Sequence, residues 1–135
     1  MVDYIYAFLI SLGSMAILDA TWLGVIAPKF YKKHIGFIMA KSPNWFAAIA
    51  FYLVYIFGLT IFVVHPGWIE HQAIMKIILL GGLFGLVTYS TYDLTNQSTL
   101  KNWPFIVTIT DIFWGTCLTA GVSIVAVEIL KNWVK

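Results

Sequence analysis

Residues 104–130 read PFIVTITDIFWGTCLTAGVSIVAVEIL, and this stretch decides the fold of the chain. It is an apolar run that, as a helix rising about 1.5 Å per residue, is long enough to cross the ~30 Å hydrocarbon core of a bilayer. Three more runs of this kind precede it, at about residues 3–27, 45–64 and 73–93. Short polar connections marked by proline separate the runs. We therefore predict an all-α fold, a single domain over residues 1–135 that forms an integral membrane bundle of four transmembrane helices.

The composition agrees with a membrane protein. Hydrophobic residues make up 61% of the chain and charged residues only 10%, against about 25% charged in soluble domains, and the mean hydropathy is +0.88. All eight basic residues are lysines, so the chain has no guanidinium group for forked recognition of phosphate. These few lysines are scattered beside apolar runs, which argues against nucleic acid as a partner. The partner that the composition indicates is the lipid bilayer.

The lysines also indicate an orientation in the membrane. The first and third connections together hold more lysines than the opposite side of the predicted bundle: Lys29, Lys32, Lys33, Lys41 and Lys101 against Lys76, Lys131 and Lys135. Cytoplasmic loops of membrane proteins are enriched in basic residues. We therefore predict that both termini lie outside and that these two connections lie in the cytoplasm. The first run begins with Asp3 and lacks the basic start of a cleavable signal peptide, so we interpret it as a retained helix.

An aspartate lies three residues before a tryptophan in both outer runs, in ILDATWLG at 17–24 and in ITDIFWGT at 109–116. An acid at the centre of a lipid-spanning helix costs about 2.5–3.5 kcal/mol on insertion scales, so such residues are commonly functional and face a bundle interior or a water-filled cavity. Counting along the antiparallel helices places Asp19 and Asp111 at about one depth from the cytoplasmic face. We predict that their carboxyl groups converge there.

Polar and aromatic side chains from all four runs lie at this depth, whereas the other half of the bilayer holds mainly Leu, Ile, Val, Phe and Gly. Residues three apart share a helix face, so the aromatics would line the space beside the acids. We predict an acidic, aromatic-lined cup open to the cytoplasm. Its rim and mouth would hold Lys29, Lys32, Lys33 and Lys101, and Thr91, Thr95, Asn96 and Gln97. The candidate ligand-binding residues are Asp19, Trp22, Tyr52, Tyr55, Tyr89, Tyr92, Asp93, Asn96, Asp111 and Trp114.

Asp93 adds a third acid to this region. Like charges at close range require a shared proton, a bound cation or a protonated acid. The chain shows no familiar zinc spacing, glycine-rich phosphate loop or catalytic triad. The sequence therefore assigns no catalytic residue, no metal site and no cofactor.

Several strings together resemble a known family: Asp19-x-x-Trp22-Leu23-Gly24, Phe51-Tyr52, Thr91-Tyr92-Asp93-Leu94-Thr95-Asn96, Trp103-Pro104 and Asp111-x-x-Trp114-Gly115. They look like a family of small predicted bacterial membrane proteins described only as a domain of unknown function, and the similarity covers nearly the whole chain. The TYDLTN string at 91–96 is its most specific piece. The resemblance implies a four-helix protein of the bacterial inner membrane and supplies no activity.

The acids also have a structural interpretation. A buried carboxylate can accept bonds from an indole N–H or a hydroxyl group and so join helices, at roughly 0.6 kcal/mol on average. A reciprocal pairing of this kind would join Asp19 to Trp114 and Asp111 to Trp22. Asp93, near the predicted end of its helix, would bond backbone amides in a turn.

Three functions remain open. The first is binding or transport of a cation or small polar molecule, in which carboxylates supply charge and aromatic faces hold organic cations. The second is a membrane enzyme for a lipid or isoprenoid-like substrate, in which paired acids do acid–base work or hold Mg²⁺. The third is a helper subunit whose acids only stabilise the bundle, and whose membrane partner or second copy docks on small residues. We expect both stripes of small residues to pack within the bundle instead: Ala16, Ala20 and Gly24, and Gly81 and Gly85.

Overall fold

A computed structural model describes residues 1–134 of the chain. Within these residues the regular structure is entirely helical. Four segments are long and apolar enough to cross a membrane: Val2–Ile35, Trp45–Ile69, Ile74–Thr99 and Phe105–Trp133. The predicted all-α fold with four transmembrane segments is confirmed.

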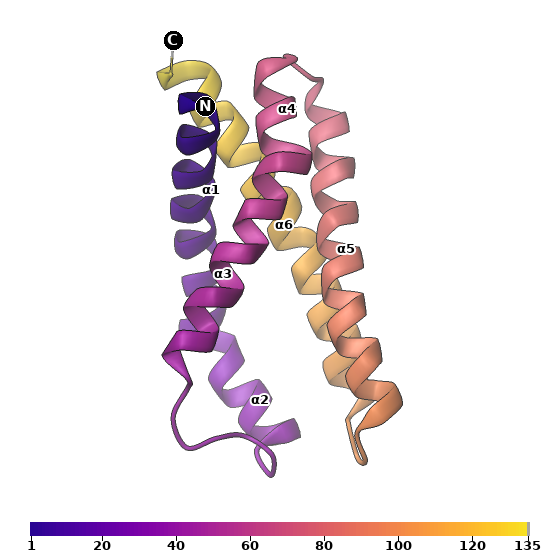
Figure 1. Cartoon of the computed structure of the whole chain (residues 1–135). Helices are drawn as coiled ribbons and strands as arrows, with labels where there is room; N and C mark the ends of the chain where they lie inside the picture. Colours follow the sequence, from indigo (N-terminus) through magenta and orange to yellow (C-terminus); the bar gives the residue numbers. More distant parts are fainter. Residues whose placement is uncertain (135) are drawn as a thin grey trace.

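The four segments run alternately up and down (Figure 1). They comprise, in chain order, α1 (Val2–Thr21), the π-helical turn η1 (Trp22–Ile26) and α2 (Ala27–Ile35); α3 (Trp45–Leu59), the π-helical turn η2 (Thr60–Val64) and α4 (His65–Ile69); α5 (Ile74–Thr99); and α6 (Phe105–Trp133). Both termini and α4 lie at one end of the bundle, which we call the terminal end (Figure 1). The connections 36–44 and 100–104 lie at the opposite end, which we call the hairpin end.

The first two segments continue past their predicted ends because a π-helical turn accommodates a proline in each. Pro28 and Pro66 lack the N–H that a helix interior needs, and a proline ring clashes with the carbonyl four residues earlier. A wider π-helical turn precedes each proline. In the first, the N–H of Ala27 donates to the carbonyl of Trp22, five residues back. The helix therefore tilts at Pro28 and continues as α2 to Ile35 (Figure 1).

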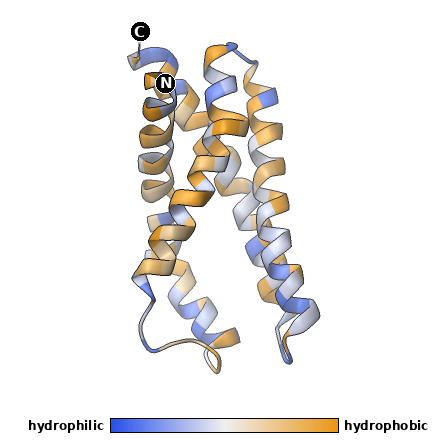
Figure 2. Cartoon of the chain, in the orientation of Figure 1, coloured by the Kyte–Doolittle hydropathy of each residue, from blue (hydrophilic) through white to orange (hydrophobic). Residues whose placement is uncertain are grey.

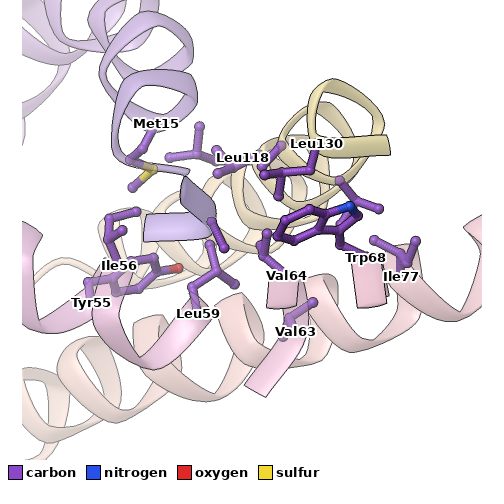
Figure 3. Close-up of a cluster of buried hydrophobic side chains, with 14 residues drawn as sticks. Met15, Tyr55, Ile56, Leu59, Val63, Val64, Trp68, Ile77, Leu118 and Leu130 are labelled. Carbon is purple, nitrogen blue, oxygen red and sulfur yellow. The ribbon is translucent and has the colours of Figure 1, made fainter. Parts of the chain in front are cut away.

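The hydrophobic core fills the terminal end of the bundle. It draws on all four segments, and Figure 3 labels Met15, Tyr55, Ile56, Leu59, Val63, Val64, Trp68, Ile77, Leu118 and Leu130. Hydrophilic residues concentrate instead on α2, on the far part of α5 and at the tips of the bundle (Figure 2). The molecule therefore has a densely packed apolar half and a more polar half toward the hairpin end.

The most extensive helix contact in the bundle joins α5 to α6. Glycines permit it: a Cβ atom added at Gly85 would overlap the carbonyl oxygen of Gly115. Gly115 in turn faces the ring of Tyr89, and Gly81 faces Ser123. In a bilayer, small residues favour such backbone contact. The expectation that Gly81 and Gly85 pack within the bundle is confirmed.

The other stripe of small residues lies on the outside. Ala16, Ala20 and Gly24 are exposed, and no atom lies within 4 Å of a Cβ added at Gly24. The expectation that this stripe packs within the bundle is wrong. Met15 and Asp19, which are four residues apart, lie on a different face of α1, and that face packs inward.

A closed set of hydrogen bonds fixes the connection between α5 and α6. The indole N–H of Trp103 donates to the hydroxyl of Thr108 at 3.1 Å, and that hydroxyl donates to the side-chain oxygen of Gln97 at 3.0 Å. The side-chain amide of Gln97 donates back to the carbonyl of Trp103 at 3.1 Å. The ends of the two helices are thereby held together one turn beyond Asp93.

We predict that Gly85→Ala lowers the free energy of unfolding by about 1–3 kcal/mol, because the added methyl group would push α5 away from α6. Gly82→Ala is the matched control: the nearest atom to its added Cβ lies 3.7 Å away, so stability should stay the same or rise slightly. Thermal unfolding of both variants in detergent measures the difference. Equal melting temperatures would contradict the prediction.

Candidate functional site

A cavity of about 840 Å³ lies in the half of the bundle toward the hairpin end, and all four segments line it. Every predicted ligand-binding residue except Asn96 is part of its lining: Asp19, Trp22, Tyr52, Tyr55, Tyr89, Tyr92, Asp93, Asp111 and Trp114. The lining also includes residues that were not among those candidates: Leu23, Tyr31, Phe51, Val54, Gly58, Phe62, Phe84, Val87, Thr88 and Thr91. The cavity lining thus includes Asp19 and Asp111, the acids of the outer two membrane-spanning segments.

Asp19 joins α1 to α3. Its carboxylate accepts a hydrogen bond from the hydroxyl of Tyr52, and the residue is only 7% exposed. A bond between a hydroxyl and an ionised carboxylate is stronger than one between neutral groups. Asp19 therefore holds two helices together at the cavity wall.

Asp111 joins α6 to α2, because the hydroxyl of Tyr31 donates to its carboxylate at 2.5 Å. Tyr31 reaches it since the first segment continues past Pro28 and tilts beneath the bundle (Figure 1). Sequence reasoning missed Tyr31 because it ended the first helix at residue 27. A signal was present: proline fits the first turn of a helix, and no further proline or glycine occurs before Gly36.

The indoles of Trp22 and Trp114 stack on each other, with ring centroids 4.6 Å apart and planes 15° apart. The predicted pairing of these indoles with the two aspartates is wrong. The carboxylates accept hydrogen bonds from tyrosine hydroxyls instead, and the two indoles bury their faces by stacking. The indole N–H of Trp114 is buried and has no hydrogen-bond partner among residues 1–134.

Asp93 lies inside α5, which continues to Thr99, so its interpretation as a turn residue at a helix end is wrong. The residue is fully buried, and neither carboxyl oxygen has a hydrogen-bond partner in the described part of the chain. The carboxyl group of Asp111 lies beside it. Burying unpaired negative charge is costly, so this pair needs a proton or a cation between its members.

Aromatic side chains form the walls of the cavity. Tyr55 packs edge-on against Phe84 and Tyr89, with ring centroids 5.4 Å and 6.3 Å away. Its hydroxyl also shares a hydrogen bond of 2.5 Å with Thr119 of α6. Contacts on three sides therefore fix the position of this ring.

None of the lysines among residues 1–134 lines the cavity. The predicted rim lysines are exposed at the hairpin end: Lys29, Lys32, Lys33 and Lys101. Of the predicted mouth residues only Thr91 lines the cavity, whereas Thr95, Asn96 and Gln97 lie farther along α5. The ion pair found among residues 1–134 joins Lys131 to Glu128 on α6, near the terminal end. The three carboxyl groups thus face the cavity without a cationic side chain in its wall.

Over the same described residues, no group of three or more His, Cys, Asp and Glu side chains is arranged to hold a metal ion. The polar groups in the cavity lining are carboxylates, hydroxyls and indole N–H groups, and the N–H of Trp114 has no partner among residues 1–134. Such a set can hold a group that carries positive charge and donates hydrogen bonds.

Comparison with known proteins gives a family and no closer relative. No curated protein and no solved structure matches the chain. A family model described as a predicted membrane protein (DUF2177) matches residues 4–128, a range that contains every residue of the cavity lining. The chain therefore belongs to this family of predicted membrane proteins, whose function is unknown.

Proposed function

We propose that the protein binds a small organic cation in the cavity, with the positive group of the ligand at Asp93 and Asp111. The observation that carries the proposal is Asp93, a fully buried cavity residue whose carboxyl oxygens have no partner among residues 1–134. Ionisable residues at such depth commonly mark ligand or ion sites in membrane proteins. A bound cation would neutralise the carboxyl pair, and a hydroxyl or N–H group of the same ligand would supply the missing hydrogen bonds.

The charge of the lining favours a cation over an anion. Asp19, Asp93 and Asp111 all line the cavity, whereas no lysine within the described range 1–134 does, and the chain has no arginine. A cleft lined by one sign of charge attracts ligands of the opposite sign. A phosphate or carboxylate ligand would be repelled by this lining.

The walls favour an organic cation over a bare metal ion. A cation near an aromatic ring gains about 0.5–2 kcal/mol, and aromatic rings are the main wall material here. The volume of about 840 Å³ lies within the range of roughly 300–1,000 Å³ typical of small-molecule sites. The unpartnered indole N–H of Trp114 would donate to a polar atom of the same ligand.

The helper-subunit interpretation has its own support. Asp19 and Asp111 each bond to a tyrosine from another helix, as acids with a purely structural role would. That interpretation needs a proton shared between Asp93 and Asp111, because an ionised, buried carboxyl group without a partner destabilises the bundle. Cation binding accounts for all three acids, so we favour it.

We also propose a membrane location and an orientation for the protein. The lysine-rich connections lie at the hairpin end, next to the cavity, so the cavity would lie in the cytoplasmic half of the bilayer. In the bacterial inner membrane that the motifs imply, such a cup would bind a cation from that side or serve one step of its transport. Protonation of Asp93 would then favour release.

We predict that Asp93→Asn weakens binding of choline at least about tenfold, which corresponds to about 1.4 kcal/mol. The amide keeps the shape of the side chain and removes its charge. The measurement is equilibrium binding of radiolabelled choline to the protein in nanodiscs. Asp3→Asn, at the start of α1 and outside the cavity lining, removes the same charge and should leave binding unchanged.

Two results would contradict the proposal. One is equal choline binding by Asp93→Asn and the unaltered protein. The other is equal affinity for choline and for its neutral isostere, in which a carbon atom replaces the nitrogen.

We also predict that Tyr52→Phe lowers the free energy of unfolding by about 1–3 kcal/mol, because the buried carboxylate of Asp19 loses its donor. Tyr6→Phe, at an exposed position on α1, is the control and should have little effect. Asp93→Asn should not destabilise the ligand-free protein, since it removes an unpartnered buried charge. Thermal unfolding compares the three variants. A loss in Asp93→Asn as large as that in Tyr52→Phe would make Asp93 a structural residue.

A further inference from the structure

The cavity opens sideways between α3 and α5. Figure 1 shows these two helices diverging toward the hairpin end. The lining residues at the opening are exposed: Phe51, Val54 and Phe62 on one side, and Val87, Thr91 and Tyr92 on the other. Val54 is 73% exposed and Val87 is 55% exposed, and both lie well inside membrane-spanning segments. What surrounds the opening at this depth is therefore lipid.

The cavity wall is acidic at its inner end and mainly apolar at its opening. Asp93 and Asp111 are buried at the inner wall, on α5 and α6. The opening is edged mainly by apolar side chains such as Val54, Phe62 and Val87. A ligand that fits both parts has a charged end and an apolar end.

We infer that the occupant is a membrane amphiphile with an ammonium headgroup, held at Asp93 and Asp111, whose alkyl chain passes between α3 and α5 into the bilayer. The inference rests on the proposed function and names its ligand class. An ammonium group supplies what the buried carboxyl pair lacks, a positive charge and N–H donors. The alkyl chain would stay among apolar side chains and lipid tails, so that it need not enter water.

The same charges argue against a phospholipid headgroup. A phosphate placed near Asp93 and Asp111 would add negative charge where no lysine lines the wall. The inferred headgroup therefore carries an amine and no phosphate.

A second groove provides an internal control. It lies along α1 and α3, has a volume of about 320 Å³, and includes Phe8, Phe57 and Ile61 in its lining. Among residues 1–134, no carboxyl group lines this groove. Acyl chains should therefore occupy it whatever headgroup they carry.

Photo-crosslinking tests where the chain of the ligand lies. The probe is dodecylammonium with a diazirine on its alkyl chain, added to the protein in nanodiscs, and the comparison probe is dodecanol with the same diazirine. We expect the ammonium probe to label peptides at the opening, around Val54 and Val87, in preference to the second groove. Asp93→Asn should reduce this preference to that of the alcohol probe. Equal labelling of opening and groove by both probes would overturn the inference.

A pair of matched substitutions tests the opening itself. Val87→Trp would fill it, whereas Leu79→Trp adds the same bulk on α5 at a position 64% exposed and outside both linings. We expect Val87→Trp to weaken dodecylammonium binding several-fold and Leu79→Trp to leave it unchanged. Equal binding by the two variants, or an equal loss in both, would overturn the inference.

Choline separates the two proposals. If choline binding depends on Asp93 but dodecylammonium neither labels the opening nor responds to Val87→Trp, the ligand is a compact cation. The proposed function then stands and the amphiphile inference fails. If neither cation binds in an Asp93-dependent way, the proposed function itself fails.

Discussion

The backbone contact between α5 and α6 is the constraint on which the candidate site depends. Because Gly85 and Gly115 have no side chains, the two helices approach closely, and the hydroxyl of Thr119 bonds to a carbonyl of its own helix at 2.6 Å. This approach brings Asp93 beside Asp111, away from water. Two carboxyl groups in such a position require a counter-charge or a proton. The close approach of the helices at these two glycines thus brings together, further along, two carboxyl groups that need a counter-charge or a proton.

The same pairing leaves space on the other side of α5. Since α5 lies along α6, α3 meets it mainly near η2 and diverges from it toward the hairpin end (Figure 1). Side chains of the terminal half close the space there, whereas the hairpin half keeps a cavity. The tilt at Pro28 then brings Tyr31 to Asp111 from beneath. Helix bending and one tight helix pair together produce the cavity.

The positions of the acids followed from the sequence because helical rise and period vary little. Counting residues along antiparallel helices put Asp19 and Asp111 in one region, and both line the same cavity. Hydrogen-bond partners did not follow, since several donors lie within reach of each carboxylate and helix rotation decides among them. The extent of the helices was also misjudged: a π-helical turn accommodates Pro28, and the polar residues after Asp93 do not end α5. The missed turns of the first segment contained Tyr31, and the missed turns of α5 put Asp93 in a helix interior instead of at its end.

The uneven density of the bundle also has a mechanical consequence. Packed side chains fill the terminal half of the bundle, whereas the hairpin half surrounds a cavity of about 840 Å³. Compression acts on internal voids far more than on close-packed interiors. Lateral pressure in the leaflet around the hairpin half would therefore compress the cavity, whereas the same pressure in the opposite leaflet would act on closely packed side chains.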